Sequence, residues 1–379
     1  MKISKRPARS DEAVPDRADA HKIQVEARAS QGARLRRSTW RSLQKGSSNQ
    51  QLGLIVALLV FSVAIYSKNH NYADEANLIN ILVSSVYIFI IGIVSTMVFV
   101  CGGLDLSVGS VYALGCISSA MALTNGIPIV LSILIGLGAG ALAGLINGVI
   151  IEYLGIPPLI TTLGSLYVIE GIVVVLTGGN SVFPLPSAFN AIGEDSIGPV
   201  PWLVVYAVVL GVIGHIVLEY TRFGYRIRAT GGNRIAARAM GIHVKRLSVT
   251  VYVLSGISAG LAGILFASQL GSGQPSIGGQ TELLVIAAVI IGGTSMFGGT
   301  GTIIGTALGA LLLEVITDGL VMIDINPAYQ DIVIGAVIVL AVGIDHIQRS
   351  RQWRVSAATA VAAAEAVEGA DVSQGYEAT

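Results

Sequence analysis

Long apolar runs alternate with short polar or glycine-containing breaks along most of the chain. The clearest runs, each bounded by turn residues or charge, cover residues 78–100, 127–151, 200–218, 248–270 and 303–323. Shorter or weaker runs cover residues 52–67, 106–123, 156–176, 283–297 and 329–345. A hydrocarbon layer about 30 Å thick is crossed by roughly 20 apolar residues of helix, whose backbone groups satisfy one another. The pattern therefore predicts an all-α, polytopic integral membrane helical bundle of about ten transmembrane helices, or about eight or nine if some runs are re-entrant.

Composition supports a membrane protein over a water-soluble one. Hydrophobic residues make up 53% of the chain and charged residues 12%, whereas soluble domains carry about 25% charged residues. No Lys or Arg occurs from residue 69 to 221 or from 247 to 348. The two cysteines, Cys101 and Cys116, lie in apolar stretches and the five histidines are scattered, so neither a disulfide framework nor a metal site is expected.

The cations fall into groups that predict the sidedness of the bundle. Twelve lie between Lys2 and Lys45, seven between Arg222 and Arg246, and three between Arg349 and Arg354, while Lys68 stands alone. The positive-inside rule places the three groups in the cytoplasm, which requires an even number of spans between them. Six spans followed by four satisfy this condition, and both termini are then cytoplasmic.

The same pattern divides the chain into three parts. Residues 1–48 form a basic, polar tail without apolar periodicity, and residues 349–379 form a second cytoplasmic tail; neither need fold. Residues 49–348 form the transmembrane domain, with a long cytoplasmic loop at residues 220–247. A secretory signal within residues 1–67 is the alternative for the first run, but so long a polar lead is atypical of signals, which favours a permanent span.

Small residues recur every four positions within the run at 127–151. They lie on one stripe of a helix and let two backbones approach closely, because lipid gives helices no hydrophobic reason to associate. The stripe is expected to pack inside one subunit, or else to form a subunit contact or a moving surface. Its members are Gly136, Gly140, Gly144 and Gly148.

Glycines also mark two breaks, at residues 102–109 and 292–301. In the first break, Asp105 and Ser107 stand where they can cap the helix that follows. Interrupted spans can line a transport path, whereas the alternative is a tight turn at a membrane face. Spans two to five and seven to ten start on opposite sides of the membrane, which permits an inverted repeat.

The cytoplasmic loop contains a predicted short helix. Asn233 can cap its start and Gly241 can end it. Arg234 and Arg238 lie one turn apart, and another side of the helix is apolar, formed by Ile235, Ala236, Ala239 and Met240. Such a helix suits docking into the groove of a partner, although basic residues beside lipid headgroups would also explain the charge.

Motifs for catalysis are missing from the sequence. No Gly-rich loop ends in Lys followed by Ser or Thr, and no Gly-x-Ser-x-Gly elbow is present, so the chain is expected to be no enzyme. Any ATP must be hydrolysed by another chain. An ion-driven secondary transporter is the alternative, because acidic residues lie in or near spans: Glu152, Glu170, Glu282, Glu314 and Asp318.

Four motifs resemble those of the membrane permease subunits of bacterial ATP-binding-cassette (ABC) importers for monosaccharides, of the ribose, xylose, arabinose and galactose type. The resemblance covers about residues 52–347. Its motifs are Gly102-Gly103-Leu104-Asp105-Leu106-Ser107-Val108-Gly109; Asn147-Gly148 with Gly155-Ile156-Pro157-Pro158-Leu159-Ile160-Thr161-Thr162-Leu163-Gly164; Gly231-Gly232-Asn233 through Ile242; and Gly292-Gly293 through Gly298-Gly299-Thr300-Gly301. Permeases for branched-chain amino acids look similar, so such an amino acid or another small polar solute stays an alternative cargo.

The resemblance implies a transporter assembly in the bacterial inner membrane. A coupling helix would dock on an ABC ATPase subunit with two nucleotide-binding domains, which would hold ATP and Mg²⁺, so no cofactor is expected in this chain. An extracytoplasmic sugar-binding protein, a second permease copy in a homodimer and membrane lipid complete the expected partners, and no nucleic acid is among them. The implied coupling residues are Asn233, Arg234, Ala237, Arg238, Met240, Gly241 and Ile242.

The substrate path is expected to use polar groups in or beside the spans, because such groups can line a wet passage. The candidates are Asp105, Ser107, Asn147, Thr161, Thr162, Glu170 and Asn180.

Overall fold

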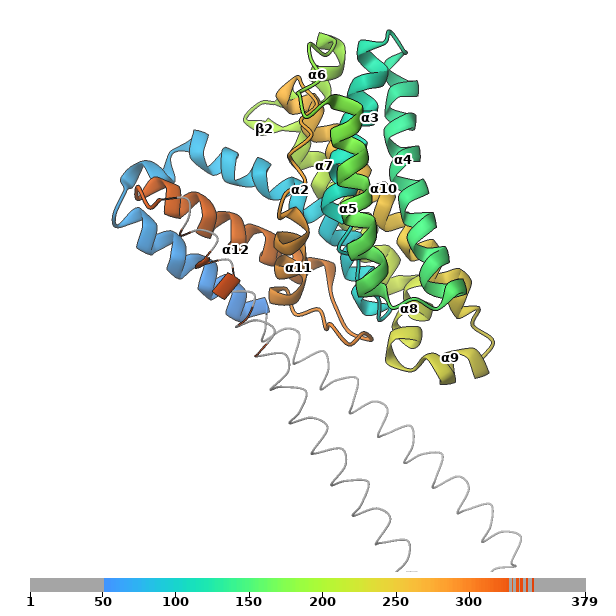
Figure 1. Ribbon diagram of the computed structural model, residues 1–379. Helices are drawn as coiled ribbons and strands as arrows, with labels where there is room; N and C mark the ends of the chain where they lie inside the picture. Colours follow the sequence, from blue (N-terminus) through green and yellow to red (C-terminus); the bar gives the residue numbers. More distant parts are fainter. Residues whose placement is uncertain are drawn as a thin grey trace, which may run out of the picture. The chain divides into compact units, whose positions relative to one another are not determined.

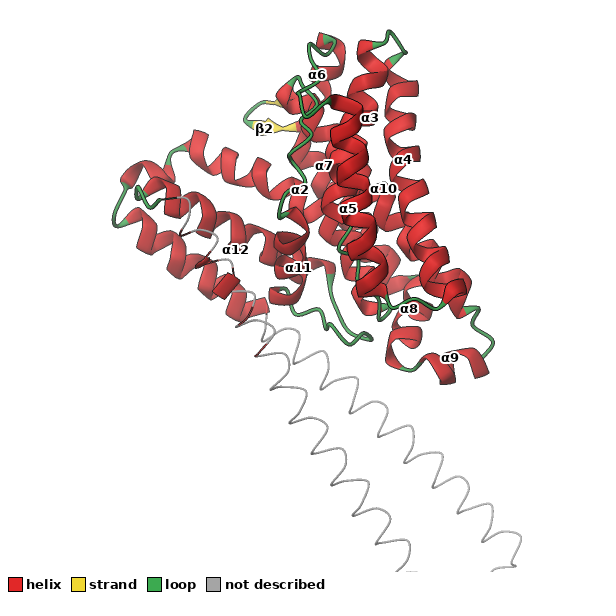
Figure 2. Ribbon diagram, in the orientation of Figure 1, coloured by secondary structure: helices red, strands yellow, loops and turns green. Residues whose placement is uncertain are grey.

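A computed structural model describes residues 51–326 and a few positions between residues 329 and 343. The predicted tails 1–48 and 349–379, and most of the predicted span at 329–345, lie outside the described residues. Nearly all described elements are helices (Figure 2). The β-structure of the described residues is one short antiparallel hairpin of strands β1 (Ser196–Ile197) and β2 (Val200–Pro201) and an isolated antiparallel bridge between Val182 and Gly273. The prediction of an all-α fold is confirmed.

The helices follow the predicted apolar runs closely. An apolar helix at Gln51–Tyr66 comes first, followed by the short 3-10 helix η1 (His70–Ala73). The remaining helices are α2 (Glu75–Val100), α3 (Val108–Thr124), α4 (Ile129–Val149), the π-helix η2 (Ile150–Leu154), α5 (Pro158–Thr177), α6 (Ser187–Glu194), α7 (Trp202–Tyr220), α8 (Arg222–Gly232), α9 (Arg234–Ala239), α10 (Val244–Leu270), α11 (Thr281–Ile291) and α12 (Ile303–Met322).

Six helices of the described part are long and apolar enough to cross a membrane: α2, α4 with η2, α5, α7, α10 and α12. Three shorter apolar helices join them: Gln51–Tyr66, α3 and α11. A polytopic membrane bundle is thus confirmed, while the count of about ten spans and the inverted repeat stay predictions. The predicted run at 283–297 is wrong at its end, because α11 stops at Ile291 and Gly293 turns the chain with a φ of 88°.

Helix α10 packs against α4, α3 and α2 (Figure 1). In the 18-residue apolar stretch of each helix, 78% of the residues of α2 and 61% of those of α10 are buried. The corresponding share is only 22–28% in α4, α5 and α7. Exposed apolar side chains on these outer helices suit contact with lipid, since a membrane protein needs no polar surface at this depth.

The glycine stripe of α4 packs against α10 of the same chain. A Cβ atom at Gly140 would overlap the carbonyl oxygen of Gly256, and a Cβ atom at Gly144 would overlap that of Tyr252. At Gly148 a Cβ atom would lie 2.9 Å from the Cα atom of Val249. The two backbones therefore touch along this stripe, which is what small residues permit in membrane helices.

Candidate functional site

The basic loop folds into two helices rather than one. Helix α8 (Arg222–Gly232) precedes the predicted short helix, which is α9 (Arg234–Ala239). Helix α8 is a correction to the prediction, which gave residues 220–247 a single short helix after Asn233. Two residues could have indicated α8. Thr221 caps its start, since its Oγ1 accepts a hydrogen bond from the Gly224 amide at 3.3 Å, and Ile227 gives the helix a fully buried apolar side chain.

Asn233 separates the two helices and caps the second, as predicted. Its Oδ1 accepts hydrogen bonds from the amides of Ile235 and Ala236, both at 3.0 Å. At the other end Gly241 has a φ of 80° and donates to the Arg238 carbonyl oxygen at 2.9 Å, while Ile242 donates to Ala237. These bonds satisfy carbonyl groups that the end of a helix leaves free.

Helix α9 and the residue that follows it, Met240, expose apolar side chains. Ile235 is 83% exposed and Met240 is 82% exposed, whereas Ala237 is buried against the protein. The Arg238 side chain is exposed and makes no hydrogen bond or ion pair with any described residue. An exposed surface with two large apolar groups and a free cation is typical of a docking element.

Arg234 points the other way and binds the bundle itself. Its Nη2 donates to both carboxylate oxygens of Glu152 on η2, at 2.5 and 2.7 Å. The Glu152 side chain is 4% exposed and that of Arg234 is 42% exposed. Arg234 and Arg238, which the sequence placed on one basic side, therefore have different roles, because Arg234 anchors α9 to the end of α4.

Three glycine segments meet beside this anchor, and we call Gly102, Gly231 and Gly298 the glycine junction. A Cβ atom at Gly298 would lie 3.0 Å from the Gly231 Cα atom and 3.1 Å from the Gly102 Cα atom. A Cβ atom at Gly231 would overlap the carbonyl oxygen of Val100, which accepts a hydrogen bond from Gly299 at 2.9 Å. Both predicted breaks thus lie at the same end as the basic loop, in agreement with the parity of the spans.

Arg228 on α8 strengthens the same region. Its Nη2 forms an ion pair with Glu219 of α7 and donates to the Gly301 carbonyl oxygen at 3.1 Å. The helix pair α8–α9 is therefore tied to α7, to the segment after α11 and to η2, three places far apart in the sequence.

Three of the predicted path residues form one buried hydrogen-bond network. The Ser107 hydroxyl and amide donate to Asp105 Oδ1 at 2.6 and 3.0 Å, and the Ser255 hydroxyl of α10 donates to Asp105 Oδ2 at 2.8 Å. Asn147 of α4 donates to the Ser107 hydroxyl at 2.8 Å and accepts from Ser165 of α5. The predicted capping role of Ser107 is wrong, since its side chain bonds to Asp105 instead of the first turn of α3.

The other four predicted path residues lie outside this network. Thr162 is buried and donates to the Pro158 carbonyl oxygen at 2.9 Å, whereas the buried Thr161 hydroxyl has no partner. Glu170 and Asn180 are exposed. The residues that the sequence analysis missed are Ser165 and Ser255, because a serine in an apolar helix gives no signal that distinguishes network members from others.

Among the described residues, no group of three or more His, Cys, Asp or Glu side chains could hold a metal ion.

Comparison with known protein families gives one match that covers most of the chain. The sequence model of the family described as "Branched-chain amino acid transport system / permease component" matches residues 77–342. The match therefore includes α2 from residue 77 onward, the glycine junction, the buried network and α8–α9.

Curated relatives match over most of their own length. The ribose import permease protein RbsC of Bacillus subtilis is 36% identical over 298 residues, which cover 78% of this chain and 92% of the relative. The galactose/methyl galactoside import permease protein MglC of Escherichia coli is 34% identical over 319 residues, covering 79% and 95%. The autoinducer 2 import system permease protein LsrC of Yersinia enterocolitica is 34% identical over 300 residues, covering 78% and 82%.

Proposed function

The chain belongs to the branched-chain amino acid transport system / permease component family, and from that premise we propose that it forms the translocation path of an ABC importer for a monosaccharide. It is a multi-pass membrane protein and a permease component. Two relatives, a ribose import permease and a galactose/methyl galactoside import permease, support a sugar as the cargo over a branched-chain amino acid.

The assembly contains other chains that supply what this chain lacks. An ABC ATPase subunit with two nucleotide-binding domains binds ATP and Mg²⁺ and hydrolyses ATP. A sugar-binding protein delivers cargo at the opposite, extracytoplasmic face, and a second permease copy completes a homodimer. The protein lies in the bacterial inner membrane. The positive-inside rule places the cations of residues 222–246 in the cytoplasm, and an even number of spans on either side of this loop places both termini there too.

The exposed side chains of Ile235, Arg238 and Met240, on and directly after α9, are the observation that carries this proposal. A partner groove that receives Ile235 and Met240 buries two large apolar side chains that are more than four-fifths exposed here. Arg238 adds a cation without a competing partner among the described residues. Burial of the apolar groups supplies affinity, and the cation selects an acidic rim on the ATPase.

Motion of α9 is transmitted to the membrane-spanning helices through an ion pair and through directly touching backbones. The ion pair of Arg234 with Glu152 transmits displacement to η2 and α4. The glycine junction transmits it to the end of α2 and to the segment after α11, since backbones touch there without intervening side chains. ATP binding moves α9, the bundle alternates between inward and outward access, and hydrolysis resets it.

A charge reversal on α9 tests this function. In proteoliposomes that contain the whole importer, Arg238→Glu is expected to lower ATP-driven uptake of ribose or galactose about tenfold, the effect of losing about 1.4 kcal/mol of interface energy. Arg226→Glu is the matched control, because Arg226 is also exposed and unpaired among the described residues but lies on α8. Equal uptake by the Arg238 variant and the unchanged protein would contradict docking through α9.

A further inference from the structure

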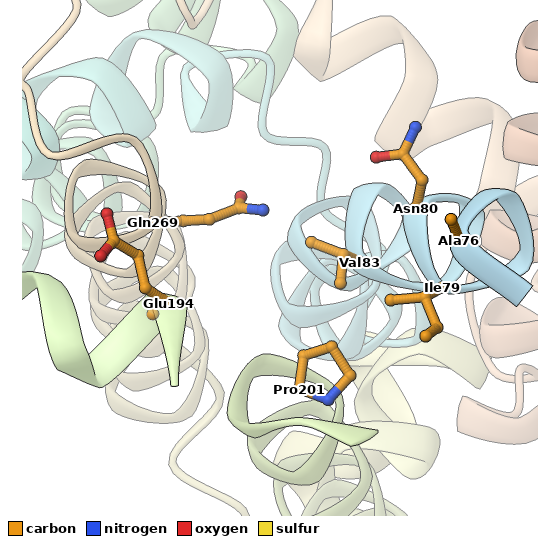
Figure 3. Close-up of a pocket in the computed structure, with 8 residues that line it drawn as sticks. Ala76, Ile79, Asn80, Val83, Glu194, Pro201 and Gln269 are labelled. Carbon is orange, nitrogen blue, oxygen red and sulfur yellow. The ribbon is translucent and has the colours of Figure 1, made fainter. Parts of the chain in front are cut away.

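A cavity of about 360 Å³ lies between the first turns of α2 and the elements α6, β2 and α10 (Figure 3). Figure 1 shows α6 and β2 at the end of the bundle opposite α8 and α9. This volume falls within the range of sites for small molecules. We call it the Gln269 cavity.

Polar side chains with unused hydrogen-bonding capacity line the Gln269 cavity. Asn80 of α2 and Glu194 of α6 make no side-chain hydrogen bond or ion pair with any described residue. Gln269 extends from α10 toward α2 (Figure 3), and its Oε1 accepts a hydrogen bond from Tyr87, which leaves the Nε2 group as a free donor. Two amides and a carboxylate thus offer both donors and acceptors at one place.

The remaining wall is apolar and carries no cation. Ile79, Val83 and Pro201 contribute hydrocarbon surface, and no Lys or Arg is among the lining residues. The carboxylate of an anion or of an amino acid finds no cationic partner among these lining residues, and Glu194 repels it. A neutral solute with several hydroxyl groups instead donates to Glu194 and accepts from the two amides.

We propose that the Gln269 cavity is a binding site on the permease itself for a neutral polyhydroxylated solute of monosaccharide size. This inference rests on the proposed function, because it assigns the cargo a stopping place at the face where a binding protein would release it. The open mouth and the exposed Asn80 and Glu194 make binding weak, so that the site passes the solute on.

Saturation-transfer NMR on the full chain in lipid nanodiscs tests the site, with D-ribose, D-galactose and L-leucine as probes. Transfer to the sugars and none to leucine is expected. Ala76→Trp, at an exposed position that lines the cavity, is expected to abolish transfer, and Asn80→Ala to weaken binding about fivefold. Leu78→Trp and Asp195→Asn are the controls, because both positions are exposed neighbours that do not line the cavity.

The outcomes separate this inference from the proposed function. The Gln269 cavity is not a sugar site if the unchanged protein, Ala76→Trp and Asn80→Ala give equal sugar signals. A leucine signal that Ala76→Trp removes would also overturn it. ATP-driven sugar uptake by the unchanged importer tests the function separately, since it needs no result from the variants. Melting midpoints equal to that of the unchanged protein establish that each variant is folded.

Discussion

Glu152 and Arg234 form an ion pair across 82 residues of sequence, with both carboxylate oxygens bound to one guanidinium nitrogen. The carboxylate is almost fully buried, and the guanidinium supplies its countercharge. Helix α9 has six residues, too few to be stable in isolation. The pair therefore holds in place the element that we propose to dock on the ATPase.

Removing the carboxylate should release α9. Glu152→Ala is expected to increase hydrogen–deuterium exchange of the α9 amides about tenfold, because a hydrogen bond to a charged group contributes about 1.5–3 kcal/mol and Arg234 is partly solvated. Arg234→Ala should have a similar effect. The double variant should exchange no faster than either single variant, since both changes remove the same interaction. Strictly additive effects would show that the two side chains act independently.

Two adjacent glycines offer a matched test of the glycine junction. Gly231→Ala places a methyl group on the Val100 carbonyl oxygen, whereas a Cβ atom at Gly232 meets nothing within 4 Å. Gly231→Ala is therefore expected to cost about 1–3 kcal/mol and to lower the melting midpoint by several degrees. Gly232→Ala should leave the midpoint unchanged. Equal behaviour of the two variants in thermal unfolding and in ATP-driven uptake would contradict a tight junction.

Hydrophobic periodicity predicts the helices well because burial in lipid imposes the same length requirement on every span. The runs at 78–100, 200–218 and 303–323 agree with α2, α7 and α12 to within a few residues. Local chemistry also predicts the start and end of α9, since the Asn233 cap and the left-handed Gly241 depend on neighbours in sequence. Such features need no knowledge of the rest of the fold.

Long-range contacts are where sequence reasoning fails. By sequence, Glu152 is one of several acidic residues in or near spans that could couple transport to ions, whereas in the structure it pairs with Arg234. The sequence predicts that Asp105 and Ser107 cap α3, but in the structure Ser255 and Asn147, from other helices, complete a network around them. No spacing along the chain reveals these partners, because the packing of α10 against α3 and α4 brings them together.

Variants of Asp105 distinguish a structural role of its carboxylate in the buried network from a role in the substrate path. Its two oxygens accept three hydrogen bonds from Ser107 and Ser255, and the residue is 5% exposed. Asp105→Ala leaves these donors without their acceptor, so we expect a loss of about 2–4 kcal/mol and little folded protein in the membrane. Asp105→Asn keeps an acceptor and should retain most of the folded protein. Ser255→Ala removes one donor and should have the smallest effect. The yield and melting midpoint of purified protein measure this order, and a stable but transport-inactive Asp105→Ala variant would instead place the carboxylate in the path.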